Sequence, residues 1–106
     1  MKDVDNEILI NSKANGYDHH YYFDEQDINK VKAELIGTEY KMSIYTDFSG
    51  MQIYSCNHLS TDPCFDILPI RRKSIAMEPQ EDFLTLHLLK PNEKYHHFIK
   101  LVFSKK

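Results

Sequence analysis

Apolar and polar residues alternate with a period of two along several short stretches of the chain. The alternation is clearest at residues 40–46, 51–56 and 95–103, and it recurs at 84–88. Successive side chains of a β-strand point to opposite faces, so this pattern predicts strands that bury one face and expose the other. We therefore predict an all-β fold built from antiparallel strands.

The stretches between these strands predict how the strands connect. Residues 91–94 (PNEK) form a polar turn, so we expect 84–88 and 95–103 to pair as a hairpin. Prolines interrupt residues 57–74, which we expect to form a long loop.

One segment is ambiguous. The apolar positions of residues 28–36 fit the spacing of a helix, and the acidic residues 24–27 are suited to a helix start. The alternation within 31–35 fits a strand equally well. The β pattern on both sides favours the strand.

Length and charge exclude several classes of protein. A chain of 106 residues with 42% hydrophobic and 27% charged residues is expected to be globular, with residues 1–106 forming one small domain or a portion of one. The 13 basic and 16 acidic residues give a net charge of −3, which does not favour binding to nucleic acid or to anionic lipid. No apolar run approaches the roughly 18 residues of a membrane helix, and the acidic N-terminus is unlike a signal peptide. We expect a soluble cytoplasmic protein.

The two cysteines do not indicate a disulfide framework or a metal site. Without an export signal, Cys56 and Cys64 are expected to be reduced thiols. With His58, and with His19 or His20 as a fourth ligand, they would make a zinc site, but this spacing matches no common zinc pattern. We predict neither a metal nor another cofactor.

Glu78 is the most informative candidate for catalysis. Pro79 disfavours helical dihedrals in the residue before it, so Glu78 should be extended. A glutamate at the mouth of a sheet, in partly apolar surroundings, acquires a raised pKa and becomes a usable general base. The alternative is a solvated glutamate at the end of a strand.

Three further residues are candidates for binding a sugar. Asp18 follows a glycine turn, where a carboxylate either binds sugar hydroxyls or caps the turn. Gln52 and Tyr54 point the same way from one predicted strand and offer an amide and an aromatic face. Such a pair suits a carbohydrate, although a half-exposed strand often contains these residue types.

Taken together and in order, these patches resemble a known family. The relevant stretches are residues 16–19 (GYDH), 45–47 (YTD), 50–54 (GMQIY), 75–80 (IAMEPQ) and 89–95 (LKPNEKY). With 45–47 and 50–54 taken as one patch, four patches in this order are similar to the C-terminal part of the aldose 1-epimerase (galactose mutarotase) family.

The resemblance implies a fold and an activity. The fold is an antiparallel β-supersandwich, of which this chain would form a part. The activity is interconversion of the α and β anomers of a free hexose such as galactose or glucose. Glu78 matches the glutamate that takes the proton from the anomeric hydroxyl, and Asp18 matches the aspartate that grips sugar hydroxyls. Gln52 matches a glutamine of the same pocket, and Tyr54 an aromatic position.

The resemblance covers only the C-terminal part of the family's domain. The family's general-acid histidine and its second sugar-binding histidine belong to motifs that have no match in this sequence. We therefore expect a truncated form with weak or no activity alone. One alternative is a site completed in a homo-oligomer, with His19, His20, His58 or His87 as the acid, or by a partner chain that supplies the missing part. Another is a structural or interaction remnant that associates through exposed sheet edges.

Overall fold

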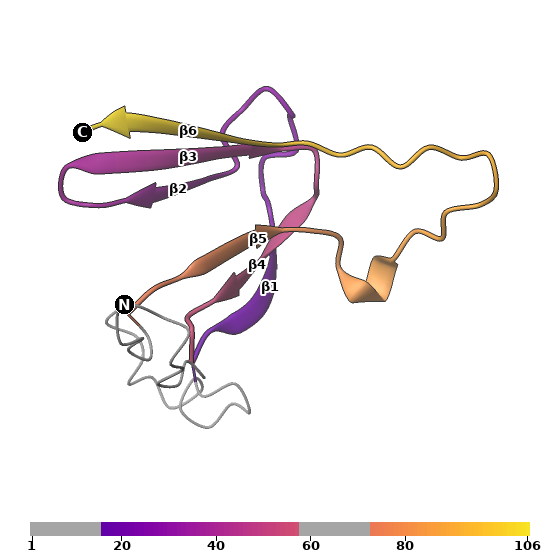
Figure 1. Ribbon diagram of the computed structural model, residues 1–106, viewed down its shortest axis with the longest axis horizontal. Helices are drawn as coiled ribbons and strands as arrows, with labels where there is room; N and C mark the ends of the chain where they lie inside the picture. Colours follow the sequence, from indigo (N-terminus) through magenta and orange to yellow (C-terminus); the bar gives the residue numbers. More distant parts are fainter. Residues whose placement is uncertain (1–15, 58–72) are drawn as a thin grey trace, which may run out of the picture. The chain divides into compact units, whose positions relative to one another are not determined.

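The computed structural model describes residues 16–57 and 73–106, and these residues form β-strands and one short helical turn (Figure 1). This confirms the prediction of an all-β, antiparallel fold. Within the described ranges, no helix is long and apolar enough to cross a membrane. The elements are β1 (Asp18–Tyr22), β2 (Ala33–Ile36), β3 (Tyr40–Thr46), β4 (Gly50–Tyr54), β5 (Ala76–Pro79), the 3₁₀-helix η2 (Phe83–Thr85) and β6 (Ile99–Lys105).

The described residues divide into two compact units. The first unit contains residues 16–21, 52–57 and 73–78, and the second contains 22–51 and 79–106. The described strands form two three-stranded sheets, in the order β1-β4-β5 and β2-β3-β6. Most residues of the first sheet belong to the first unit, and the second sheet lies within the second unit.

The sheet of the second unit has β3 at its centre, paired antiparallel with β2 and β6. Ile44 lies opposite Ala33 on one side and Leu101 on the other, and it is only 1% exposed. The alternation along residues 40–46 therefore predicts this strand correctly, since its apolar positions share the face that Ile44 occupies.

The opposite face of the same sheet carries a polar contact between β2 and β3. The Ser43 hydroxyl donates a hydrogen bond to Glu34 Oε1 at 3.0 Å, and Lys41 Nζ lies 3.1 Å from the same oxygen. Hydrogen bonds from Lys41 and Ser43 hold the pKa of Glu34 below its ordinary value. Such cross-strand contacts stabilise the pairing of β2 with β3.

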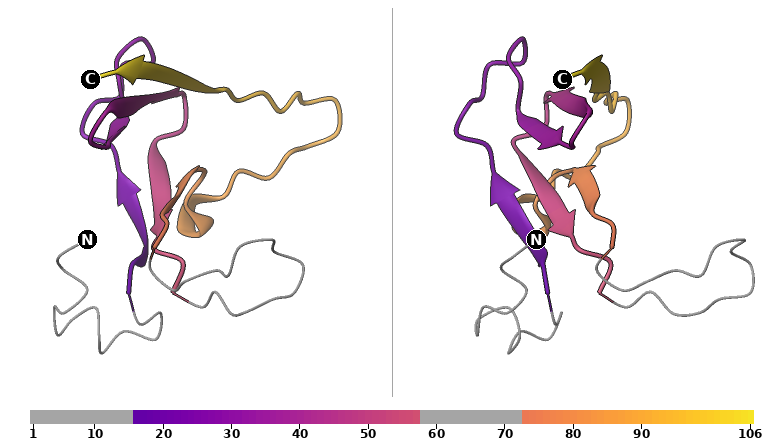
Figure 2. Two further views of the ribbon diagram at one scale, coloured as in Figure 1. Left: turned by 60° about the vertical axis from the view of Figure 1, so that its left-hand side comes forward. Right: turned by 90° about the vertical axis from the view of Figure 1, so that its left-hand side faces the viewer.

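In the other sheet, β1 pairs with β4, and no inserted residue interrupts this pairing. The Ser55 amide donates to the Tyr17 carbonyl at 3.0 Å, and the Phe23 amide donates to the Ser49 carbonyl at 2.9 Å. These two bonds are six residues apart on both strands (23 − 17 and 55 − 49), so the register is unbroken. Figure 2 shows β1 and β5 on either side of β4, both running against its direction.

The ambiguous segment contains a turn followed by a strand. The Asp27 carboxylate accepts a hydrogen bond from the Asn29 amide at 3.0 Å, and the Lys30 amide donates to the Asp27 carbonyl at 3.1 Å. Only residues 33–36 form a strand, β2. The strand prediction is confirmed for this second half.

The predicted hairpin of 84–88 with 95–103 is wrong. Residues 83–85 form η2, because the Asp82 carboxylate accepts the Leu84 amide at 3.2 Å and caps a helical turn. Residues 86–98 contain no strand, and β6 pairs with β3 instead. Local alternation predicted that β6 is a strand, but it did not predict the partner. That partner is β3, which pairs with β6 at seven positions.

Several sequence predictions fall partly on residues 58–72. Cys64, His58 and most of the expected loop at 57–74 lie outside the described residues. Cys56 is described and is a half-buried free thiol.

Candidate functional site

The candidate sugar site is centred on a hydrogen bond between Asp18 and Gln52. Gln52 Nε2 donates to Asp18 Oδ1 at 2.9 Å, which joins the first residue of β1 to the middle of β4. The Asp18 side chain is exposed and Gln52 is half-buried. Two residues separated by 33 others in the sequence are thereby brought into direct contact within one unit.

The unbroken register places further candidates on the same face as this pair. Because Tyr17 lies opposite Ser55, Asp18 lies opposite Tyr54 and His20 lies opposite Gln52. Directly opposite residues of an antiparallel sheet point to the same face. The Asp18–Gln52 bond is thus a diagonal contact between neighbouring pairs.

Glu78 joins this face from β5. The Gln80 amide donates to the Gly50 carbonyl at 3.3 Å, so two residues further along the antiparallel pair Glu78 lies opposite Gln52. Glu78 has the extended backbone of a strand, as expected for a residue before proline. Its side chain is exposed to solvent.

All four predicted site residues therefore share one face of the β1-β4-β5 sheet. They are Asp18, Gln52, Tyr54 and Glu78. Two carboxylates, an amide and an aromatic ring on one face provide acceptors, a donor and an apolar surface, which are the groups that a polyhydroxylated ring requires.

The histidines that were considered as the acid differ in their positions. His20 is on the shared face and is half-buried, with both ring nitrogens enclosed. His19 alternates to the other face, where its ring centroid lies 6.5 Å from those of Tyr17 and Tyr21. His87 belongs to the second unit and is exposed, with Nε2 3.3 Å from a Glu93 oxygen.

A cluster around His97 in the second unit was missed by sequence reasoning. His97 Nδ1 lies 3.1 Å from Asp47 Oδ2, and its Nε2 lies 3.5 Å from Glu81 Oε1. Its ring stacks on Phe48 with a centroid separation of 4.1 Å. Adjacent histidines at 96 and 97 gave no signal for this cluster, because its other members come from distant parts of the sequence.

Asp47 is the acidic centre of this cluster. Burial raises the pKa of Asp47, but hydrogen bonds from the Phe98 amide and the His97 ring outweigh it, so the pKa lies below its ordinary value. The cluster thus holds a charged carboxylate against a half-buried imidazole and ties residues 97–98 to the end of β3.

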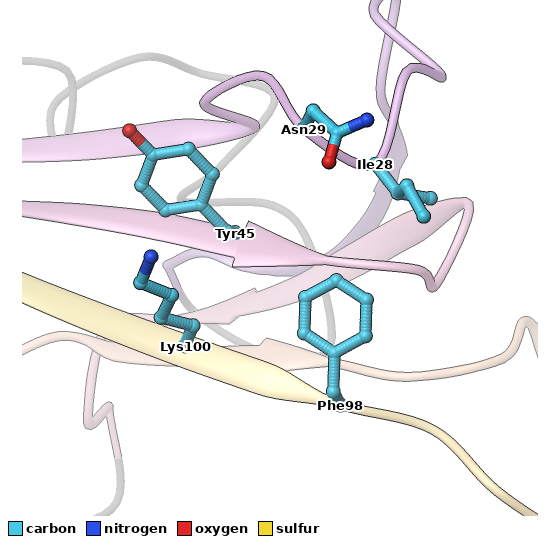
Figure 3. A pocket seen from close by; sticks show the side chains of 5 residues that line it. All are labelled: Ile28, Asn29, Tyr45, Phe98 and Lys100. Atoms are coloured by element: carbon cyan, nitrogen blue, oxygen red, sulfur yellow. The ribbon is translucent and has the colours of Figure 1, made fainter.

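A pocket of about 460 Å³ lies on the second unit (Figure 3). The Lys100 ammonium lies 5.2 Å from the Tyr45 ring centroid, as expected for a cation–π contact. None of the four predicted site residues, all of which are described, lines this pocket. Its lining consists of Ile28, Asn29, Tyr45, Phe98 and Lys100.

The described ranges contain no group of three or more histidine, cysteine, aspartate or glutamate side chains able to hold a metal ion. The chain matches no family model, no curated protein and no solved structure.

The lowered pKa of Asp47 predicts a pH dependence of stability. A carboxylate whose pKa is lower in the folded state stabilises the fold above its unfolded pKa of about 3.9, and this contribution is lost as the pH falls through the folded pKa. Asp47→Asn should therefore lower the free energy of unfolding at pH 7, and the difference from wild type should shrink below about pH 4.

Urea denaturation at a series of pH values measures this difference. Asp24→Asn, at an exposed aspartate of the same unit, is the matched control and should match wild type at every pH. An Asp47→Asn difference that is constant with pH would contradict the role of the charged form.

Proposed function

We propose that this chain is an aldose 1-epimerase-like protein that binds a free hexose in the cytoplasm and has weak or no anomerase activity alone. Galactose and glucose are the substrates that we infer. The proposal includes the family's supersandwich fold, of which the two three-stranded sheets would form a part. It involves no metal and no other cofactor.

The observation that carries this proposal is the Asp18–Gln52 hydrogen bond. The bond occupies one Asp18 oxygen, which leaves the other to accept hydrogen bonds from sugar hydroxyls. It also orients the Gln52 amide so that its carbonyl and its second N–H are available to neighbouring hydroxyls. Held together in this way, the two side chains can bind adjacent hydroxyls with little loss of rotamer freedom.

Tyr54 and Glu78, on the same face, supply an aromatic surface for the sugar and a general base. In this proposal the Tyr54 ring packs against the apolar face of the sugar, and Glu78 faces the anomeric carbon. The Glu78 carboxylate takes the proton of the anomeric hydroxyl, the oxygen forms a carbonyl with C1, and the bond from C1 to the ring oxygen breaks. Rotation about the C1–C2 bond and the reverse steps give the other anomer.

We infer weak activity because no family-type histidine is available to donate a proton to the ring oxygen. The ring oxygen must gain a proton as its bond to C1 breaks, and the family's acid-histidine motif has no match in this sequence. Water then has to donate that proton. Loss of a positioned acid typically lowers a rate by about 10²–10⁴-fold.

Mutarotation of freshly dissolved α-D-galactose, followed by polarimetry, tests the proposal. Any rate above spontaneous mutarotation should disappear in Glu78→Gln, because the amide cannot accept the proton. Glu39→Gln changes an exposed glutamate of the second unit in the same way and should leave that rate unchanged. An enhanced rate that persists in Glu78→Gln would remove this residue from the mechanism.

The alternative function is an interaction module, and one observation favours it. In the part of the chain that the structure describes, β6 pairs with β3 on one side only, and all seven of its residues are exposed. Its face next to Ile44 carries Leu101 and Phe103, which are 48% and 69% exposed. Exposed apolar edge strands favour pairing with a second copy.

Light scattering coupled to size exclusion tests this alternative. Wild type should elute as a dimer or larger assembly, and Phe103→Lys should shift it towards the monomer, because a charge at the edge disfavours pairing. Leu88→Lys is the control, since Leu88 is 82% exposed but lies outside the strands. A wild-type monomer would contradict association.

A further inference from the structure

Two buried polar side chains contact the residue that precedes Asp18. Ser55 and Asn57 follow β4 and are both 0% exposed. Buried polar groups destabilise a fold unless they are hydrogen-bonded. The sequence alone does not show which groups would bond a buried serine and a buried asparagine. Both belong to the same unit as Asp18.

The hydrogen bonds of these two residues converge on the backbone of Tyr17. The Tyr17 amide donates to Ser55 Oγ at 2.9 Å. The Tyr17 carbonyl accepts from the Ser55 amide at 3.0 Å and from Asn57 Nδ2 at 2.9 Å. The Ser55 hydroxyl also donates to Asn57 Oδ1, so the two side chains are joined to each other. We call this group of contacts the Tyr17 clamp.

Gly16 and Cys56 allow the Tyr17 clamp to close. Cys56 has a φ of 52°, a left-handed conformation that turns the chain between Ser55 and Asn57. Gly16 has a φ of 149°, and a Cβ atom there would lie 2.1 Å from Asn57 Oδ1. The Asn57 amide therefore occupies the space that any other residue at position 16 would need.

The Tyr17 clamp holds the backbone immediately before Asp18. Residue 17 is directly bonded to residue 18, and the side chains of Tyr17 and Ser55 belong to the face of the sheet away from the Asp18–Gln52 pair. A shift of Tyr17 would move the Asp18 carboxylate relative to Gln52. Binding groups must be held within about 0.5 Å of their productive geometry.

We propose that Ser55 and Asn57 are positioning residues that fix Asp18 for sugar binding through the Tyr17 clamp. This inference rests on the proposed function, since it assigns the clamp to the same site. Neither residue touches the sugar in this account.

The test compares Ser55→Ala with Ser43→Ala in the full chain. Both replace a buried serine that makes a side-chain hydrogen bond, but Ser43 bonds Glu34 in the second unit. Galactose affinity is measured by nuclear magnetic resonance titration of the ¹⁵N-labelled protein. We expect Ser55→Ala to weaken binding about tenfold and to shift the Gln52 side-chain amide resonances. Ser43→Ala should change affinity less than about twofold and leave those resonances in place.

A double mutant separates positioning from general destabilisation. If the clamp acts through Asp18, then Ser55→Ala should cause no further loss of affinity in an Asp18→Asn background. Equal losses in both backgrounds would overturn the inference. If Ser55→Ala does not fold, Asn57→Ser takes its place, because it keeps the contacts between Ser55 and Tyr17 and removes the Asn57 amide.

The possible failures are distinguishable. Wild type that does not bind galactose would overturn the proposed function and this inference with it. Wild type that binds, together with a Ser55→Ala variant of unchanged affinity, would overturn the inference alone.

Discussion

The unbroken antiparallel pairing of β1 with β4 is the constraint on which the candidate site depends. Because no residue is inserted between the Tyr17–Ser55 and Phe23–Ser49 bonds, alternate residues of both strands keep to one face. A slip of one residue on either strand would send Asp18 or Gln52 to the opposite face and break their hydrogen bond. The site is therefore a consequence of register, and register is in turn fixed where the strands end.

Two buried polar residues fix the register where β4 ends. Ser55 and Asn57 are enclosed, so they favour the one arrangement in which their hydrogen bonds are satisfied by the Tyr17 backbone. An apolar contact at this point would tolerate small shifts, whereas a hydrogen bond weakens steeply with distance and angle. The buried polar residues of this unit thus hold the Tyr17 backbone in one position more strictly than a small apolar core would.

The sequence predicted much of the sheet structure but not its long-range pairing. Alternation located β3 and β4 because one face of each is buried, as Ile44 and Met51 show. It failed at residues 84–88, where leucines alternate but are exposed, since a local cap by Asp82 decides the conformation there. The partner of β6 was beyond a local pattern, because pairing with β3 depends on residues about 60 positions away.

The same limit applies to the candidate site. Residue types and positions indicated Asp18, Gln52, Tyr54 and Glu78 as candidates, and the resemblance to the aldose 1-epimerase family assigned their roles, but only Gln52 and Tyr54 could be placed on one face from spacing. The contact of Asp18 with Gln52 and the burial of Asn57 depend on tertiary structure. His97 was missed for a similar reason, since its carboxylate partners Asp47 and Glu81 are distant in sequence.

The most direct measurement is a galactose titration of the ¹⁵N-labelled chain that follows two side-chain amides, Gln52 on the β1-β4-β5 face and Asn29 in the pocket of the second unit. Our account predicts that the Gln52 resonances shift with saturation while those of Asn29 stay in place; shifts at Asn29 with none at Gln52, or no shift at either, would contradict it.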